Sequence, residues 1–109
     1  IEYVEDRHNI AVKKSMLLDN NKKNKIEFIH GDFTSDSINL SDADLIYISN
    51  LCLSEETNKE IANKINREVK NGTVIFSSKQ IPLKNVKDCK TTNVNQTWRK
   101  GSNIYINKI

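Results

Sequence analysis

Apolar residues recur with helical spacing in two stretches of the chain. Between about Asp6 and Asp19, apolar positions fall at i, i+1, i+7 and i+8, which places them on one face of a helix. A second helical pattern begins after Ser54, a residue type that suits an N-cap, and ends at Asn71-Gly72. The apolar positions of the two patterns are Ile10, Ala11, Leu17 and Leu18, then Ile61, Ala62, Ile65 and Val69. We therefore predict two helices, the first followed by a loop over residues 20–24.

Short runs of strand-forming residues lie between and after these helices. Residues 26–29 are rich in β-formers, and residues 44–48 form the apolar run typical of a central strand buried on both faces of a parallel sheet. Residues 73–77 form the next strand. Two poorer candidates, about 89–95 and 103–109, are placed to pair as a hairpin around Arg99-Lys100-Gly101. Residues 34–41 are polar and only weakly helical.

The order of these elements predicts an α/β fold. Short loops and right-handed crossovers should place the strands that end at Ile29, Ile48 and Ser77 side by side and parallel. Neither an internal repeat nor a linker composition indicates a second domain, so residues 1–109 are expected to form a single domain. Ile1-Glu2 already resembles the tail of a strand, so we expect an N-terminal portion to precede it.

Composition restricts the class of protein. A chain of 109 residues with 37% hydrophobic and 28% charged residues is typical of a small globular domain. The net charge of +3 permits an acidic partner, but acidic residues interrupt the scattered lysines, unlike the basic face of a stand-alone nucleic-acid-binding protein. The densest cluster, Lys22, Lys23 and Lys25, is interpreted as a solvated helix end and loop.

Cysteine usage and hydropathy indicate an intracellular protein. Cys52 and Cys89 have no C-x-x-C neighbour and only His8 and His30 as possible metal partners. We expect free thiols in a reducing compartment and no metal site. No apolar run approaches the roughly 20 residues that span a bilayer, and no signal-peptide pattern opens the chain, so no membrane contact is expected.

Acidic, aromatic and polar residues follow the expected strand ends, where ligands bind in open parallel sheets. An acidic residue such as Glu2 can accept the hydroxyl protons of a ribose, and a carboxylate beside an aromatic ring, as in Asp32-Phe33, can hold an adenine. Together they suggest a nucleoside pocket. Taken singly, each residue also has an explanation without a ligand: Glu2 as an exposed charge, Asp32 as a turn or cap residue, and Phe33 as a core residue.

Five stretches of the chain resemble the Dot1-like family of S-adenosylmethionine-dependent methyltransferases in their order and spacing. They read IEYVEDRH, IEFIHGDFTSD, ADLIYISNLCLSEE, GTVIFSSKQIPL and QTWRKGSNIYINKI, and they run nearly end to end. The resemblance implies a Rossmann-like class I methyltransferase sheet, mostly parallel with a C-terminal antiparallel pair. The family's first strand and glycine-rich loop would lie before Ile1, so we expect the C-terminal portion of the domain.

The resemblance also implies which residues bind the methyl donor, S-adenosyl-L-methionine. Glu2 falls at the family's acidic residue that binds the ribose hydroxyls. Asp32 and Phe33 fall at its adenine contacts, which makes Phe33 a stacking surface.

Three further residues are implied at the methyl-transfer centre. Asn50 matches an asparagine at its floor, Trp98 matches an aromatic that borders the channel for the target lysine, and Tyr105 lies near another. Leu51 or Leu53 would add an apolar wall. Two departures bear on the substrate: Ser49 stands where a second Asn is usual, and the region between residues 84 and 96 is shorter and more polar.

The implied activity is methyl transfer to a protein lysine, with a histone or nucleosome as acceptor, a nuclear location and a role in chromatin regulation. This in-line displacement needs no metal and depends on positioning and on an apolar channel that disfavours the ammonium form. These residues alone are expected to be inactive. Two alternatives stay open: a catalytically inactive binding module for a protein or RNA, and a methyltransferase acting on RNA or a small molecule.

Overall fold

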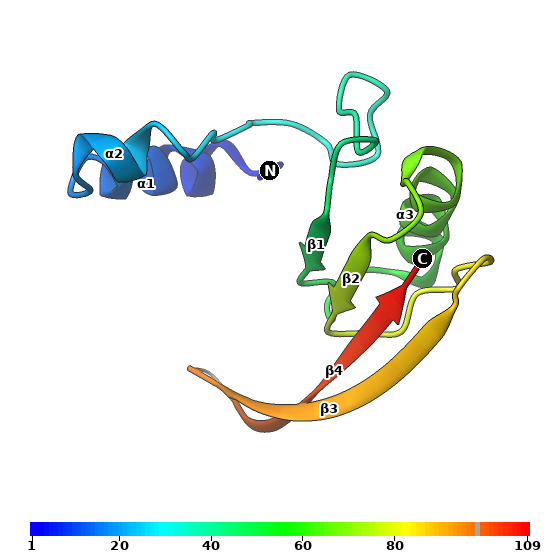
Figure 1. Cartoon of the computed structure of the whole chain (residues 1–109). Coiled ribbons are helices and arrows are strands. Elements are labelled where there is room, and N and C mark those ends of the chain that lie inside the picture. Colours follow the sequence, from blue (N-terminus) through cyan, green and yellow to red (C-terminus); the bar gives the residue numbers. More distant parts are fainter. Residues whose placement is uncertain (98) are drawn as a thin grey trace. The chain divides into compact units, whose positions relative to one another are not determined.

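The computed structural model describes residues 1–97 and 99–109, which form two compact units, residues 1–38 and residues 39–109 (Figure 1). The first unit holds two helices, and the second holds a sheet and one long helix. In chain order the elements are α1 (Glu5–Ser15), α2 (Asn20–Lys23), β1 (Leu45–Ile48), α3 (Glu55–Glu68), β2 (Val74–Ser77), β3 (Asp88–Gln96) and β4 (Arg99–Lys108).

Helix α1 confirms the first predicted helix but is shorter at its C-terminal end. Acidic residues occupy its first turn and Lys13 and Lys14 its last, which complements the helix dipole. After Ser15 the backbone changes to tighter turns, in which Leu17 N–H donates to Lys14 O and Leu18 N–H to Ser15 O. The helix buries no residue. Of the expected apolar face, Ile10 is 54% and Leu17 88% exposed, whereas Ala11 and Leu18 are half-buried.

Two further predictions for the first unit were wrong. The expected loop after Asp19 contains the single turn of α2, because the Asp19 carboxylate accepts a hydrogen bond from Lys22 N–H at 2.8 Å and caps it. Residues 26–29 form no strand. A strand needs a ladder of hydrogen bonds, and these residues lie beside only one isolated parallel bridge, between Glu2 and His30. Turns replace the weak helical tendency of residues 34–38.

The second unit contains a four-stranded mixed sheet with the order β1-β2-β4-β3. Strands β1 and β2 are parallel, from Leu45 opposite Val74 to Ile48 opposite Ser77, as predicted for the strands that end at Ile48 and Ser77. Strand β4 is antiparallel to both β2 and β3. The α/β class and the C-terminal pair are confirmed. The expected mostly parallel arrangement is not present in this sheet, because only one of its three pairings is parallel.

Strand β1 was predicted to be central and buried on both faces, and both points were wrong. It lies at the edge of the described sheet. Ile46 and Ile48 are buried, whereas Leu45 is 59% and Tyr47 is 56% exposed. A continuous apolar run does not tell one-sided from two-sided burial, because both satisfy the same sequence pattern.

Helix α3 confirms the second predicted helix. The Ser54 hydroxyl accepts a hydrogen bond from Thr57 N–H at 3.1 Å and caps the first turn. Ile61 and Ile65 are at most 3% exposed, and Ile75 of β2 is fully buried. The helix ends at Glu68, three residues before Asn71-Gly72, where Gly72 has a φ of 95°. No helix among the described residues has the length and apolar character needed to cross a membrane.

The β3–β4 hairpin is longer than predicted. Arg99, Lys100 and Gly101 lie in β4 instead of forming the turn. A register shift between Val94 and Gln96 bends the hairpin there. Gly101 has a φ of 66°, in the left-handed region that suits glycine, and its N–H donates to the Asn95 side chain at 3.1 Å. Trp98 lies outside the described residues.

Candidate functional site

In the first unit, a parallel bridge joins two predicted donor-binding segments. Glu2 N–H donates to Ile29 O at 2.9 Å, and Gly31 N–H donates to Glu2 O at 3.0 Å. Because the pairing is parallel, both segments leave the bridge in the same direction. Glu2 lies in the bridge itself, and Asp32 follows its partner His30 by two residues.

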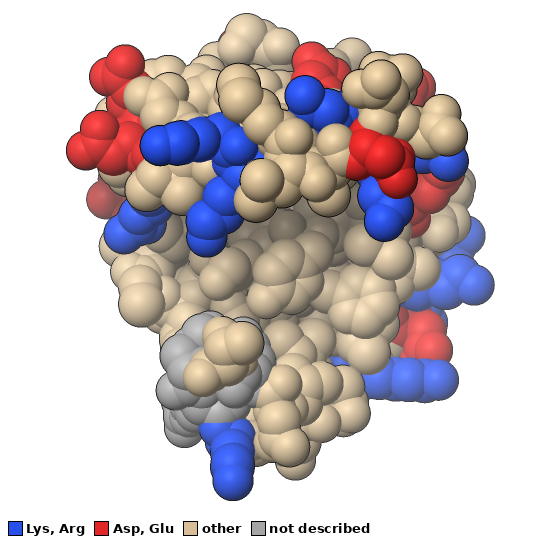
Figure 2. All heavy atoms as spheres, turned by 90° about the vertical axis from the view of Figure 1, so that its left-hand side faces the viewer, with Lys and Arg blue, Asp and Glu red and all other residues tan. Residues whose placement is uncertain are grey.

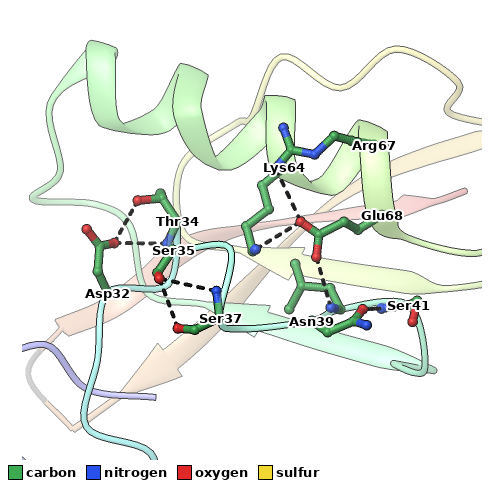
Figure 3. A network of polar contacts seen from close by, with 10 residues as sticks. Asp32, Thr34, Ser35, Ser37, Asn39, Ser41, Lys64, Arg67 and Glu68 are labelled. Carbon is green, nitrogen blue, oxygen red and sulfur yellow. Dashed lines mark hydrogen bonds and ion pairs between the residues drawn. The ribbon is translucent and has the colours of Figure 1, made fainter.

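Both predicted carboxylates make local hydrogen bonds through one oxygen. Glu2 Oε1 accepts from Val4 N–H at 3.0 Å. Asp32 Oδ1 accepts from Thr34 Oγ1–H at 2.7 Å and from Thr34 N–H at 2.9 Å (Figure 3). The Thr34 hydroxyl, followed by its backbone N–H, holds the pKa of Asp32 below its usual value, so this carboxylate is ionised at neutral pH.

Asp32 therefore acts as a turn residue, one of the roles that the sequence allowed for it. This role uses only one of its two carboxylate oxygens. Among the described residues, no hydrogen bond reaches Glu2 Oε2 or Asp32 Oδ2. Asp32 is exposed and Phe33 is half-buried. Two carboxylate acceptors and one aromatic ring thus remain able to contact a ligand.

A histidine pair beside this bridge was missed as a structural feature by sequence reasoning. The rings of His8 and His30 stack with centroids 5.3 Å apart and planes 26° apart. His30 Nε2 also lies 3.1 Å from Tyr3 O. From the sequence, these two histidines were considered only as possible metal partners of the cysteines. The part of the chain that the structure describes contains no group of three or more His, Cys, Asp or Glu residues that could hold a metal ion.

In the second unit, Asn50 is the centre of a buried hydrogen-bond network. Its Nδ2 donates to Asn58 Oδ1 at 2.8 Å and to Lys79 O at 3.0 Å. Its Oδ1 accepts from Lys79 N–H at 2.9 Å and from Ser78 Oγ–H at 3.3 Å. Its backbone N–H donates to Ser78 Oγ at 2.9 Å. Asn50 therefore links the end of β1 to α3 and to the end of β2.

This network changes the interpretation of Asn50. The residue is fully buried, and its amide already makes four hydrogen bonds. It holds the turn between β1 and α3 in place and has no capacity left for a ligand. Sequence reasoning missed Asn58 and did not single out Ser78 from the polar residues after β2. An amide one turn into α3 was the available signal for Asn58.

Tyr105 lies near the end of the second unit's sheet where β1 and β2 end. It is half-buried in β4, opposite Ser77 at the end of β2 and Thr91 of β3. Since Asn50 follows β1 and Ser77 ends β2, the register brings Tyr105 and the Asn50 turn to the end of the sheet where β1 and β2 end. Trp98, the third residue expected at the methyl-transfer centre, falls outside the described residues. Cys52 and Cys89 are free, as expected, and both are exposed.

The fold and these residues define a small α/β protein with an open mixed sheet and polar residues at its strand ends. A family model described as "Histone methylation protein DOT1" matches residues 2–105. The match covers most of the chain, which therefore belongs to the DOT1 histone methylation family. A search of curated proteins finds no match to the chain.

Proposed function

We propose that the chain is part of an S-adenosylmethionine-dependent methyltransferase that modifies lysine in a histone or nucleosome. The observation that carries this proposal is the family match over residues 2–105, which spans all six predicted site positions from Glu2 to Tyr105. A histone methylation family indicates a methyltransferase and a nuclear protein. The identity of the donor, the acceptor and the catalytic residues goes beyond that and is our proposal.

The donor-binding residues have the chemistry that the proposal requires. Carboxylate oxygens of Glu2 and Asp32 can accept hydrogen bonds from ribose hydroxyls and from the adenine amino group. The Phe33 ring offers an aromatic face for the base. The low pKa of Asp32 keeps its carboxylate a permanent acceptor at neutral pH. When bound, S-adenosylmethionine supplies a methyl group on a sulfonium, which makes the group transferable.

At the acceptor side, the chain's residues position and desolvate the target amine. A lysine must lose its proton before it can act as a nucleophile, and an apolar surrounding lowers its pKa. Leu51 and Leu53, on the turn that Asn50 holds, are 42% and 37% exposed and provide such apolar surface. In this proposal Asn50 fixes the turn. It acts neither as a base nor as a contact of the methyl donor, while Trp98 and Tyr105 line the channel for the target lysine.

Calorimetry on the protein that contains this chain tests the donor site. We expect S-adenosylmethionine to bind, and Phe33→Ala to weaken binding by about 1–3 kcal/mol, the usual scale of stacking on an aromatic ring. Asp32→Ala should act in the same direction through a lost hydrogen bond. The matched control is Phe28→Ala, which removes an exposed ring of the same unit outside the proposed pocket. A parent protein without donor binding would exclude the proposal.

Transfer of a radiolabelled methyl group then separates the candidate functions. Label in the histones of a nucleosome substrate supports the lysine methyltransferase. Donor binding with no transfer to histones, RNA or small amines supports the inactive binding module. Label only in RNA or only in a small amine supports the methyltransferase that acts on RNA or a small molecule, because the donor-binding half of such a fold does not by itself name an acceptor.

A further inference from the structure

Local hydrogen bonds build the turn over residues 31–38 of the first unit. The Asp32 carbonyl accepts from Ser35 N–H at 3.0 Å, and Ile38 N–H donates to Ser35 O at 3.1 Å. Ile38 is buried and lies close to Gly31, since a Cβ atom placed on Gly31 would be 3.6 Å from Ile38 Cδ1. The first and last residues of the turn are therefore in proximity, and the backbone of Asp32 is held in place without a ligand.

Within this turn, Thr34 holds the Asp32 side chain. Its hydroxyl and its backbone N–H both donate to Asp32 Oδ1, at 2.7 and 2.9 Å, and Thr34 is itself half-buried. Two hydrogen bonds to one oxygen restrict the rotation of the carboxylate. Figure 3 shows the other oxygen, Oδ2, directed away from Thr34. The side chain of Asp32 is therefore ordered as well as its backbone, with one oxygen left for a ligand.

The charge of the surroundings does not replace this local effect. Residues 1–38 contain six Lys and Arg residues and seven Asp and Glu residues, a net charge of −1. On the face shown in Figure 2, Lys and Arg side chains lie beside Asp and Glu side chains. The pKa of Asp32 is lowered by the Thr34 hydroxyl and then by the Thr34 N–H, with no basic side chain of the described residues contributing. Thr34 is thus the residue that orients this carboxylate and stabilises its charge.

We propose that Thr34 is a positioning residue of the donor site, which holds Asp32 so that Oδ2 is ready to accept a hydrogen bond from the amino group of the bound base. The inference rests on the proposed donor site. A carboxylate that is already ordered loses less side-chain entropy on binding than one that the ligand must order. Thr34 thereby strengthens the selection of the base through Asp32 and not through a contact of its own.

The next residue along the chain offers a donor beside this acceptor. Phe33 N–H donates no hydrogen bond within the described part of the chain. An acceptor and a donor together complement adenine, whose amino group donates and whose N1 accepts. Hypoxanthine presents the reverse pattern, an O6 acceptor and an N1–H donor, so neither hydrogen bond could form. We therefore expect the site to distinguish the two bases, and the Thr34 hydroxyl to enlarge the difference.

Calorimetry on the protein that contains this chain tests the proposal with S-adenosyl-L-homocysteine, the demethylated donor, and S-inosyl-L-homocysteine, which carries hypoxanthine instead of adenine. The parent should prefer the adenosyl ligand by about 10–100-fold, the scale of one hydrogen bond to a charged group. Thr34→Val removes the hydroxyl and keeps the branched shape. It should weaken adenosyl binding by about 3–10-fold, the scale of ordering one side chain, and leave inosyl binding unchanged. The preference should therefore fall by the same factor.

Thr34→Ser keeps the hydroxyl and should retain the parent preference. The matched control is Thr92→Val, the same chemical change at an exposed position of β3, which should also retain it. Equal weakening of both ligands in Thr34→Val, or loss of the parent circular dichroism, would assign Thr34 to folding alone and overturn the proposal. A parent that binds both ligands equally would overturn this inference and leave the donor site standing. A parent that binds neither would overturn the proposed function as well.

Discussion

The amide of Asn50 uses its full hydrogen-bonding capacity within the protein. Its partners lie on three different parts of the second unit: Asn58 on α3, and Ser78 and Lys79 after β2. A buried polar group that loses its partner pays its desolvation cost without compensation. The loss of this side chain should therefore affect folding before it affects chemistry.

We predict that Asn50→Ala lowers the free energy of unfolding by about 2–4 kcal/mol, because it leaves several buried polar groups unpaired. Urea denaturation monitored by circular dichroism measures the change. Asn63→Ala is the control, since Asn63 is an exposed residue of α3 and its truncation should change stability by no more than about 0.5 kcal/mol. A variant of Asn50 that keeps parental stability but loses methyl transfer would instead support direct contact with a substrate.

The role of Asn50 illustrates what the sequence left undetermined at the residue scale. Its position after a strand was predictable, but the direction of its side chain depends on partners 8, 28 and 29 residues away. The Thr34–Asp32 turn was more accessible, because its partners are two residues apart and local hydrogen bonding of Asp is a property of the residue type. Donor contacts of Glu2, Asp32 and Phe33 stay predictions.

At the scale of elements, Glu68 connects the end of α3 to the chain before β1. Its Oε2 accepts from Lys64 Nζ at 2.9 Å, and its Oε1 accepts from Leu40 N–H at 3.2 Å (Figure 3). Lys64 is only 1% exposed. The hydrogen bond from Lys64 lowers the pKa of Glu68 below its ordinary value of 4.5, with smaller contributions from Leu40 N–H and Arg67.

We predict that Glu68→Gln destabilises the protein by about 1.5–3 kcal/mol at neutral pH, the usual worth of a hydrogen bond to a charged group. Because the pKa of Glu68 is lower in the folded than in the unfolded state, its contribution is complete above about pH 4.5. It is lost as the pH falls through the folded-state pKa. Urea midpoints from pH 7 down to pH 3 should therefore converge for the parent and the variant.

Glu60→Gln provides the control, since Glu60 is exposed on the same helix and its replacement should shift stability by no more than about 0.5 kcal/mol at any of these pH values. A difference between parent and Glu68→Gln that stays constant down to pH 3 would contradict the ion-pair explanation. It would point to altered packing of α3.

Elements were predictable where their signals are local. The cap at Ser54 and the 3.6-residue spacing of α3 lie within the helix itself, so its start and face followed from the sequence. Residues 26–29 have strand-forming side chains, but a strand also needs neighbours, and a single bridge at His30 does not supply a ladder. The hairpin was underestimated because its strands are polar, and their pairing depends on β2, which lies beside β4.

At the scale of the whole molecule, the two units differ in how much apolar surface they bury. Among the residues that the structure describes, ten buried hydrophobic residues lie within residues 39–109, and only Ile38 belongs to residues 1–38. Helices α1 and α2 bury no residue, whereas α3 buries Ile61, Ala62 and Ile65. Local opening costs less where few apolar contacts are lost. The first unit should therefore open more readily.

We predict that amide hydrogen exchange followed by mass spectrometry is fast in α1 and α2 and slow in α3, β2 and β4 in the protein without donor. If the Glu2, Asp32 and Phe33 assignment is correct, saturating S-adenosylmethionine should slow exchange in the first unit, including Glu2 N–H and Gly31 N–H, because a ligand stabilises the state that binds it. The β3–β4 hairpin provides an internal reference, since its Asp88–Thr92 end contains none of the proposed donor-binding residues and should change little. Slow exchange of α1 without donor would show that other residues cover it in solution. Donor binding that protects only the second unit would place the nucleoside pocket away from Asp32 and Phe33.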